Sequence, residues 1–110
     1  DYENRMISAS IDCDGGKGNG DACHAVGEFF SVIRNDHAKA REVYTKNCDD
    51  RRFGASCFNL GRLFLAGRGG DQDDVAAKKR FVTGCDLGHG GACHHLGLMA
   101  LVDGEECAAI

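Results

Sequence analysis

The sequence contains no proline and no tryptophan, and it has no apolar run of the roughly eighteen residues that a membrane-spanning helix needs. Its lysines and arginines form no cluster and the formal net charge is -4, so the composition provides no basic surface for nucleic acid or an anionic membrane. These absences leave a chain of 110 residues with 16 glycines, the length of one small domain. Many glycines without proline predict helices that are joined by glycine turns.

Three patterns of catalytic residues are missing as well. No two cysteines stand in the C-x-x-C arrangement of redox enzymes. The stretch "GGKGNG" (15–20) has neither the preceding strand nor the Gly-Lys-Ser/Thr ending of a phosphate-binding loop. The acidic pairs Asp49–Asp50 and Asp73–Asp74 fall at the ends of predicted helices, where they complement the helix dipole or cap the helix. The sequence therefore identifies no catalytic residue.

Cysteine carries the strongest pattern in the chain. The first cysteines of three pairs stand at 13, 48 and 85, and the second cysteines stand at 23, 57 and 93. The pairs thus recur with a period of 34 to 37 residues. A repeat of this length is typical of α-solenoids, in which each helix hairpin buries its apolar face against its neighbours.

The repeat continues beyond the cysteines. The stretches "CHAVGEFF" from Cys23, "CFNLGRLF" from Cys57 and "CHHLGLMA" from Cys93 align without a gap, and their offsets 0, 3, 4 and 7 form one face of an α-helix. We predict that this face is buried and that Gly61 and Gly97 on it let a neighbouring helix approach closely. The face comprises Cys23, Val26, Gly27 and Phe30, then Cys57, Leu60, Gly61 and Phe64, and finally Cys93, Leu96, Gly97 and Ala100.

The periodicity predicts helices over 3–13, 22–33, 37–49, 55–66, 74–86 and 92–102. Asp36 and Asp73 precede two of them at the position of an N-cap. Each cysteine pair then straddles the turn between two antiparallel helices, where two Cα atoms can come within the ~4.4–6.8 Å of a disulfide.

One of these corners allows another interpretation. The stretch "CDLGHGGACHH" (85–95) offers Cys85, His89, Cys93 and His94 as zinc ligands. The same two cysteines also suit a structural disulfide or a disulfide that exchanges with other thiols.

The piece "SCFNLGRLFLAGRGGDQDDVAAKKRFVTGCDLGHGGACHHLGLM" resembles the Sel-1-like repeat family, and the resemblance covers nearly the whole chain. It implies an all-α fold, an α-solenoid of antiparallel helix hairpins, right-handed and stapled by disulfides. It also implies a single domain over 1–110 with about three repeats. The sequence begins at Asp1 and not at methionine, so we expect a piece of a longer chain.

Within the family, the chain resembles the cysteine-rich assembly factors of mitochondrial cytochrome c oxidase. The resemblance is carried by the stretches "AREVYTKNCDD" and "IRNDHAKA", and by the number of residues between paired cysteines, which decreases along the chain. This resemblance implies a protein-interaction scaffold in the intermembrane space, an assembly factor or accessory subunit with respiratory-complex partners. Haem binding and thiol–disulfide activity toward copper chaperones are attributed to these relatives, although no motif of this sequence carries either. The alternative is the secreted, cysteine-rich bacterial branch of the family.

The two other corners decide between zinc and disulfide, because their cysteine pairs have no accompanying set of histidines. We therefore predict structural disulfides Cys13–Cys23, Cys48–Cys57 and Cys85–Cys93, no metal site, and surface positions for His89, His94 and His95. The remaining cysteine, Cys107, stands in "CAAI", which matches a prenylation pattern. Prenylation is cytosolic, so we expect a free thiol there, or one half of a bridge to another segment or partner.

Partner contacts are predicted from the helical phase. Seven residues are expected to project away from the buried face and are the candidates for binding a partner: His24, Glu28, Phe58, Asn59, Arg62, His94 and His95.

Overall fold

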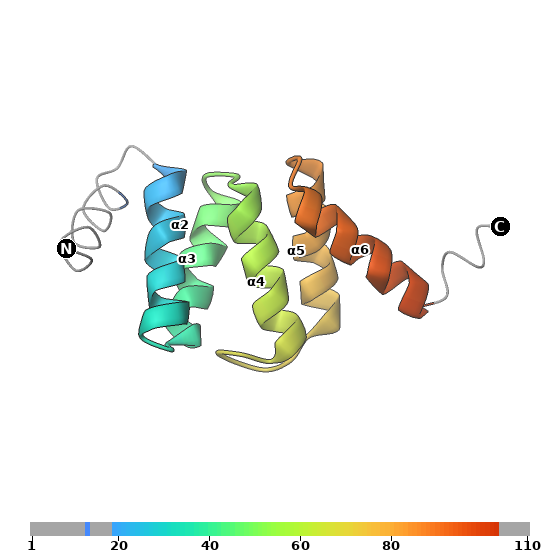
Figure 1. Cartoon of the computed structure of the whole chain (residues 1–110), viewed down its shortest axis with the longest axis horizontal. Coiled ribbons are helices and arrows are strands. Elements are labelled where there is room, and N and C mark those ends of the chain that lie inside the picture. The colour runs from blue at the N-terminus through green and yellow to red at the C-terminus, as the bar shows by residue number, and fades with distance from the viewer. Residues whose placement is uncertain (1–12, 14–18, 104–110) are drawn as a thin grey trace.

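The structure is a computed structural model that describes Cys13 and residues 19–103 (Figure 1). Its elements are α2 (Gly20–Glu28), the π-helical turn η1 (Phe29–Ile33), α3 (His37–Asp49), α4 (Gly54–Ala66), α5 (Asp74–Asp86) and α6 (Gly90–Asp103). Every regular element among these residues is helical, which confirms the predicted all-α fold. The extent of the single domain over 1–110 stays a prediction.

The predicted helices largely agree with the observed ones. Those at 37–49 and 74–86 have the predicted bounds, and those predicted at 55–66 and 92–102 begin at Gly54 and Gly90 instead. The helix predicted at 3–13 lies outside the described residues, except for Cys13, which is helical.

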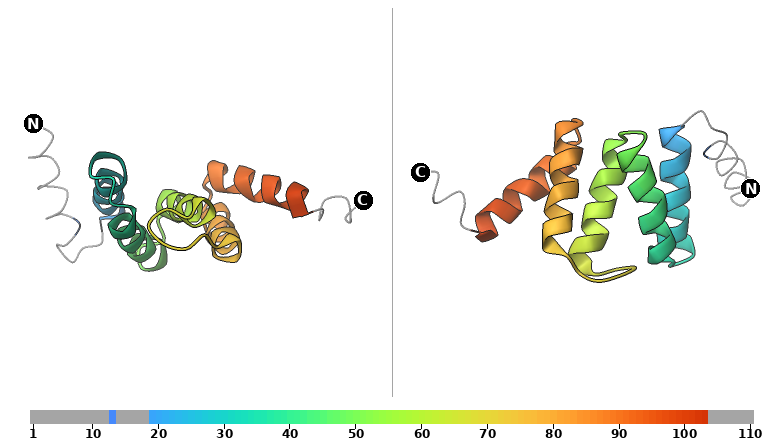
Figure 2. Two further views of the ribbon diagram at one scale, coloured as in Figure 1. Left: turned by 90° about the horizontal axis from the view of Figure 1, so that it is seen from below. Right: turned by 180° about the vertical axis from the view of Figure 1, so that it is seen from behind.

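Successive helices run antiparallel and stand side by side in a row (Figures 1 and 2). The turns within the hairpins α3–α4 and α5–α6 lie along one edge of the row, and the connections 34–36 and 67–73 lie along the opposite edge. The last helix, α6, is inclined to α5 and projects from the end of the row. This arrangement is the predicted α-solenoid of helix hairpins.

Short polar side chains begin three of the helices. Asp36 and Asp73, the predicted N-caps, each accept a hydrogen bond of 3.0 Å from the backbone N–H three residues further on. Asn19 caps α2 in the same way at 3.2 Å. At the end of α4, Gly67 has a φ of 68°, a left-handed conformation that glycine adopts without the steric cost of a side chain.

The end of the first described helix differs from the prediction. The sequence predicts an α-helix to residue 33, but the chain widens at Phe29 into a π-helical turn, in which Arg34 N–H donates to Phe29 O at 3.1 Å. No glycine or proline in 28–36 announces this change. Such turns often occur at functional sites, and this one borders a cavity.

The core consists of two clusters joined by Phe64. Ala40 and Tyr44 of α3 pack against Leu60 and Leu63 of α4 in the first cluster. Ala77 and Phe81 of α5 pack with Ala92 of α6 in the second, and Phe64 lies against both clusters.

Glycine allows the aromatic rings of these clusters to approach the preceding helix. Tyr44 lies over Gly27 of α2, and Phe81 lies over Gly61 of α4. A Cβ atom on Gly61 would be 2.7 Å from Phe81 Cε1, which is closer than carbon atoms approach without strain. The predicted close approach at Gly61 is therefore confirmed.

The prediction for Gly97 is wrong. Gly97 is exposed, and a Cβ atom built on it would meet no atom of the described chain within 4 Å. Cys93, on the same predicted face, is exposed too. The reason is that α6 is the last helix among the described residues, so no following helix of this part of the chain covers its face.

None of the helices in the described residues is both long enough and apolar enough to cross a membrane.

Candidate functional site

Three disulfides close the hairpin corners. They join the predicted pairs Cys13–Cys23, Cys48–Cys57 and Cys85–Cys93, with Cα–Cα distances of 4.7, 4.9 and 4.6 Å. The second and third bridges tie the ends of α3 and α5 to the first turns of α4 and α6, and the first bridge ties Cys13 to the first turn of α2. A bridge across so short a loop contributes roughly 2–3 kcal/mol to stability in the loop-entropy estimate.

The bridges differ in their exposure to solvent. Cys48 and Cys57 are 0% exposed, and Arg80 Nη1 lies 3.5 Å from the sulfur of Cys48. Cys93, in contrast, is exposed near the start of α6. A thiolate must reach a sulfur atom to exchange with it, so the Cys85–Cys93 bridge is more open to an external thiol than the buried Cys48–Cys57 bridge.

The corner that suggested zinc does not present a zinc site. Cys85 and Cys93 are joined to each other, so their sulfurs are not the thiolate ligands that zinc requires. Among the described residues, no group of three His, Cys, Asp or Glu side chains is placed to hold a metal ion.

Two of the three histidines at this corner are part of the fold. The His89 ring stacks on Phe58 with ring centroids 4.8 Å apart, and its Nδ1 accepts a hydrogen bond from the N–H of Ala92 at 3.2 Å. The His95 ring lies 5.1 Å from the ring of Phe58. His89 and His95 are therefore half-buried and not free surface residues, because both rings pack against Phe58 of α4. His94 is exposed.

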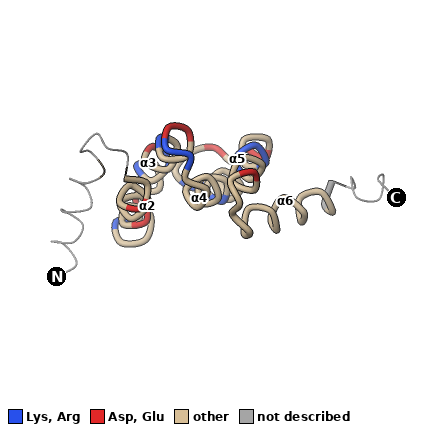
Figure 3. Tube along the Cα trace, turned by 90° about the horizontal axis from the view of Figure 1, so that it is seen from above, with Lys and Arg blue, Asp and Glu red and all other residues tan. Residues whose placement is uncertain are grey.

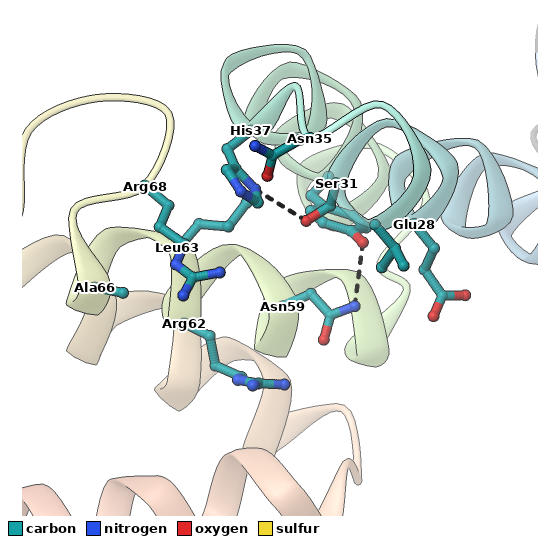
Figure 4. Close-up of a pocket in the computed structure, with 11 residues that line it drawn as sticks. Glu28, Ser31, Asn35, His37, Asn59, Arg62, Leu63, Ala66 and Arg68 are labelled. Carbon is teal, nitrogen blue, oxygen red and sulfur yellow. Dashed lines mark hydrogen bonds between the residues drawn. The ribbon is translucent and has the colours of Figure 1, made fainter.

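The main candidate site is a cavity of about 520 Å³ at the junction of α2–η1 with the α3–α4 hairpin (Figure 4). It lies between α2–η1, α3 and α4, and we call it the junction groove. Its polar and charged lining includes Glu28, Ser31, His37, Asn59, Arg62 and Arg68. Cavities that bind ligands in proteins are typically of this size.

Hydrogen bonds fix the inner wall of the junction groove. Asn59 Nδ2 donates to the hydroxyl of Tyr44 at 3.3 Å, and Ser31 Oγ lies 3.1 Å from His37 Nδ1. Burial raises the pKa of Tyr44 to about 12, so the phenol keeps its proton at neutral pH. The Tyr44 hydroxyl is therefore a donor as well as an acceptor on this wall.

The structure sorts the seven candidate residues into two groups. Glu28, Asn59 and Arg62 line the junction groove, and His94 is exposed on α6. His24, Phe58 and His95 do not project away from the fold as the helical phase suggested, because their rings pack against other helices. His24 has ring contacts with Tyr44 and Phe53, and Phe58 and His95 have ring contacts with Phe81. Contact of any of the seven with a partner stays a prediction.

His24 belongs to a buried polar network between three helices. Its Nδ1 lies 2.8 Å from Ser56 Oγ, and the amide of Asn47 donates to the same oxygen at 2.8 Å. Since Asn47 already donates to Ser56, the serine hydroxyl is free to donate to the unprotonated Nδ1 of a neutral His24. Burial is the main reason that the pKa of His24 is lowered from its usual 6.5, with Glu28 opposing the shift.

Sequence reasoning missed most of the groove lining, including three polar or charged residues, Ser31, His37 and Arg68. Ser31 lies in the π-helical turn, His37 begins α3, and Arg68 follows α4. None of them stands in the repeated pattern of apolar positions, and only the π-helical turn and the two connections bring them together.

A second cavity, of about 630 Å³, lies between α4, α5 and α6. Leu65, Val75, Leu98 and Met99 form its apolar wall, and the lining also contains three polar side chains, those of Asp74, Lys78 and His95. No Lys, Arg, Asp or Glu occurs in 90–102, so α6 contrasts with α3 and α5, which carry charges of both signs (Figure 3).

Haem binding, which the resemblance implies, needs an axial ligand beside an apolar pocket. His95 Nδ1 lies 3.2 Å from the carbonyl oxygen of Gly91, which can only accept, so in the neutral ring Nδ1 carries the proton and Nε2 has the lone pair. His95 and Met99 at the second cavity are thus of the residue types that hold haem. Haem binding itself stays what the resemblance implies, and the sequence identified no residue for it.

The fold has a solved counterpart in the Helicobacter pylori cysteine rich protein B. The two structures agree with a TM-score of 0.76 and 28% sequence identity, over 87% of this chain and 72% of the Helicobacter protein. No family model matches the sequence. With its helix hairpins and corner disulfides, the protein is a Sel-1-like repeat α-solenoid.

Curated relatives point to one kind of Sel-1-like protein, cytochrome c oxidase assembly factor 7. The human protein of this name is 30% identical over 102 residues, or 89% of this chain and 44% of its own length. The Xenopus tropicalis protein is 39% identical over 72% of this chain and 36% of its own length. The Drosophila melanogaster homolog is 33% identical over 72% of this chain and 31% of its own length. The chain thus spans less than half the length of these relatives.

Proposed function

We propose that the chain acts in the assembly of cytochrome c oxidase, as a scaffold that binds protein partners in the mitochondrial intermembrane space. The observation that carries this proposal is that relatives named cytochrome c oxidase assembly factor 7 match 72–89% of this chain. Their names favour an assembly factor over an accessory subunit of the finished enzyme.

Two features of the fold support the proposal. Three disulfides require an oxidising compartment, which disfavours the cytosol. Stacked helix hairpins form an extended surface for binding other proteins, and the junction groove lies on such a surface.

The test is disruption of the gene that encodes this chain in its own organism. Assembled cytochrome c oxidase, separated by native electrophoresis, should decrease, while the amounts of other respiratory complexes, measured on the same gel, stay unchanged. The protein should resist added protease in intact mitochondria and be degraded once the outer membrane is opened. A normal amount of cytochrome c oxidase after disruption would contradict the assembly role.

The secreted alternative rests on the likeness to the Helicobacter protein, whose identity of 28% is lower than that of the curated relatives reported above. Protease sensitivity in the assay above separates the two compartments.

A second candidate activity, thiol–disulfide exchange with a protein such as a copper chaperone, is favoured by the exposure of Cys93. In such a step an incoming thiolate forms a bond to the sulfur of Cys93, and Cys85 leaves as a thiolate. Reduction of the individual bridges, described in the Discussion, tests whether this bridge is reactive.

A further inference from the structure

Two arginines of the junction groove have no acidic partner among the described residues. Arg62 and Arg68 are exposed and line the same cavity. Other arginines are committed to the fold: Arg41 donates to three backbone carbonyls, and Arg80 forms an ion pair with Asp49. The guanidinium of Arg62 lies 5.6 Å from the centre of the Phe58 ring, a contact that leaves its N–H groups open to a ligand.

The junction groove is therefore locally cationic in a chain of net charge -4. Its lining contains two arginines and one acid, Glu28, which lies 3.7 Å from His24 Nε2 on its own helix. Figure 4 shows Glu28 on the far side of the cavity from Arg68. Two exposed arginines that line one groove favour a ligand with carboxylates, because each guanidinium can bind a carboxylate through two parallel hydrogen bonds.

Neutral groups of the groove suit a peptide main chain. Asn59 uses one amide hydrogen on Tyr44, and its carbonyl oxygen has no hydrogen-bond partner among the described residues. The hydroxyl of Tyr44 keeps its hydrogen as a donor. Asn35, at a φ of 54°, places a further amide at the rim. An amide side chain offers both an N–H donor and a C=O acceptor, which match the C=O and N–H groups of an extended peptide.

We propose that the junction groove binds an extended segment of a partner protein that carries acidic side chains, with Arg62 and Arg68 holding the carboxylates and Asn59 the main chain. This inference rests on the proposed function, because it names the chemistry of the partner that such a scaffold binds. Nucleic acid is disfavoured as the anion, since the acidic chain repels a polyanion beyond the groove.

The test uses the full chain and a fluorescent decapeptide of alternating glutamate and alanine, acetylated and amidated at its ends. A decapeptide of alternating glutamine and alanine is the uncharged control, and the same control with a free carboxyl end shows whether a chain terminus suffices. Binding is measured by fluorescence anisotropy at low salt. The glutamate peptide should bind at least roughly 10-fold more tightly than the amidated glutamine peptide, since hydrogen bonds to charged groups are the stronger ones.

Single substitutions then locate the peptide. Arg62→Gln and Arg68→Gln should each weaken binding of the glutamate peptide by roughly 3- to 10-fold. Arg52→Gln is the matched control, because it removes the same charge from an exposed position outside the groove lining and should leave the affinity unchanged. Circular dichroism checks that all three variants are folded.

Any of three results would overturn the inference. The glutamate peptide and the amidated glutamine peptide could bind equally well, or the free-carboxyl peptide could bind more tightly than the glutamate peptide. The third is that Arg52→Gln weakens binding of the glutamate peptide as much as the two groove substitutions do. If the glutamate peptide does not bind but gene disruption still reduces cytochrome c oxidase, the groove inference fails alone. If it binds through both arginines and cytochrome c oxidase is normal, the proposed function fails alone.

Discussion

The contrast between Gly61 and Gly97 offers a stringent test of the packing. Both glycines stand four residues after the second cysteine of a pair, within a helix. Replacing either by alanine should gain about 1 kcal/mol from helix propensity. At Gly97 nothing opposes this gain, because the added methyl group meets no atom of the described chain within 4 Å. Gly97→Ala should therefore stabilise the protein by about 1 kcal/mol.

At Gly61 the same methyl group collides with a buried ring. It would lie 2.7, 2.9 and 3.1 Å from three carbons of Phe81, which is 0% exposed and has no open space to move into. Overpacking of a core costs about 1–3 kcal/mol. Subtracting the gain in helix propensity, Gly61→Ala should lower the free energy of unfolding by about 0–2 kcal/mol.

Comparison of the two variants removes the propensity term, since it is the same in both. Their free energies of unfolding should differ by about 1–3 kcal/mol, the cost of overpacking alone. Urea denaturation followed by circular dichroism, with the disulfides kept oxidised, measures this difference. If Gly61→Ala is as stable as Gly97→Ala, the ring of Phe81 does not pack on α4 as described. Gly27→Ala, which faces the ring of Tyr44, should behave like Gly61→Ala.

Three further predictions concern the corners and the buried network. Graded reduction should open Cys85–Cys93 first and Cys48–Cys57 last, because Cys93 is exposed and both cysteines of the Cys48–Cys57 bridge are buried. Alkylation and mass spectrometry give the order of opening, and the reverse order would contradict this burial. His89→Ala should lower the free energy of unfolding by about 0.5–2 kcal/mol, as expected for the loss of a helix cap. His94→Ala is the control and should change it by no more than about 0.5 kcal/mol. Equal effects of the two substitutions in urea denaturation would show that His89 does not cap α6. Burial lowers the pKa of His24, so at acidic pH the unfolded chain binds more protons than the folded chain. The stability that His24 contributes is therefore complete above pH 6.5 and is lost as the pH falls through the lowered pKa. Between pH 7.5 and 5 the free energy of unfolding should fall less steeply in His24→Gln than in the unchanged protein, and an equal slope would refute the buried neutral state.

Helix positions could be predicted because they depend on local chemistry. Asp36 and Asp73 are followed by apolar residues at helical spacing, and both cap helices with the predicted bounds. The cysteine pairs were predictable for the same reason, since a hairpin corner brings its two ends together whatever the rest of the fold does. Gly97 shows where such reasoning fails. Its sequence environment repeats that of Gly61, but burial depends on a neighbouring helix, and sequence similarity between repeats does not supply one.

The candidate site could be predicted in part. Glu28, Asn59 and Arg62 were found from helical phase, because one side of a helix in a hairpin row faces the groove between hairpins. Ser31 and Arg68 could not be found this way. The first is turned into the groove by a π-helical turn without a sequence signal, and the second lies in a connection, where no periodicity applies.

The positions of the bridges and of the groove explain how a small solenoid can bind a partner. Disulfides tie α3 to α4 and α5 to α6 near the hairpin turns. The junction groove lies between α2–η1 and the α3–α4 hairpin and includes Asn35 and Arg68 of the connections. These connections lie at the opposite end of the helices from the hairpin turns (Figure 1). The shape of the groove therefore depends on contacts between hairpins, namely Tyr44 over Gly27 and the bond of His24 to Ser56. Stapled hairpins have fewer ways to rearrange, so fixing these few contacts fixes the groove before a ligand arrives. Binding then costs less conformational entropy, which favours the binding of a short acidic segment by the two arginines and the two amides of the groove.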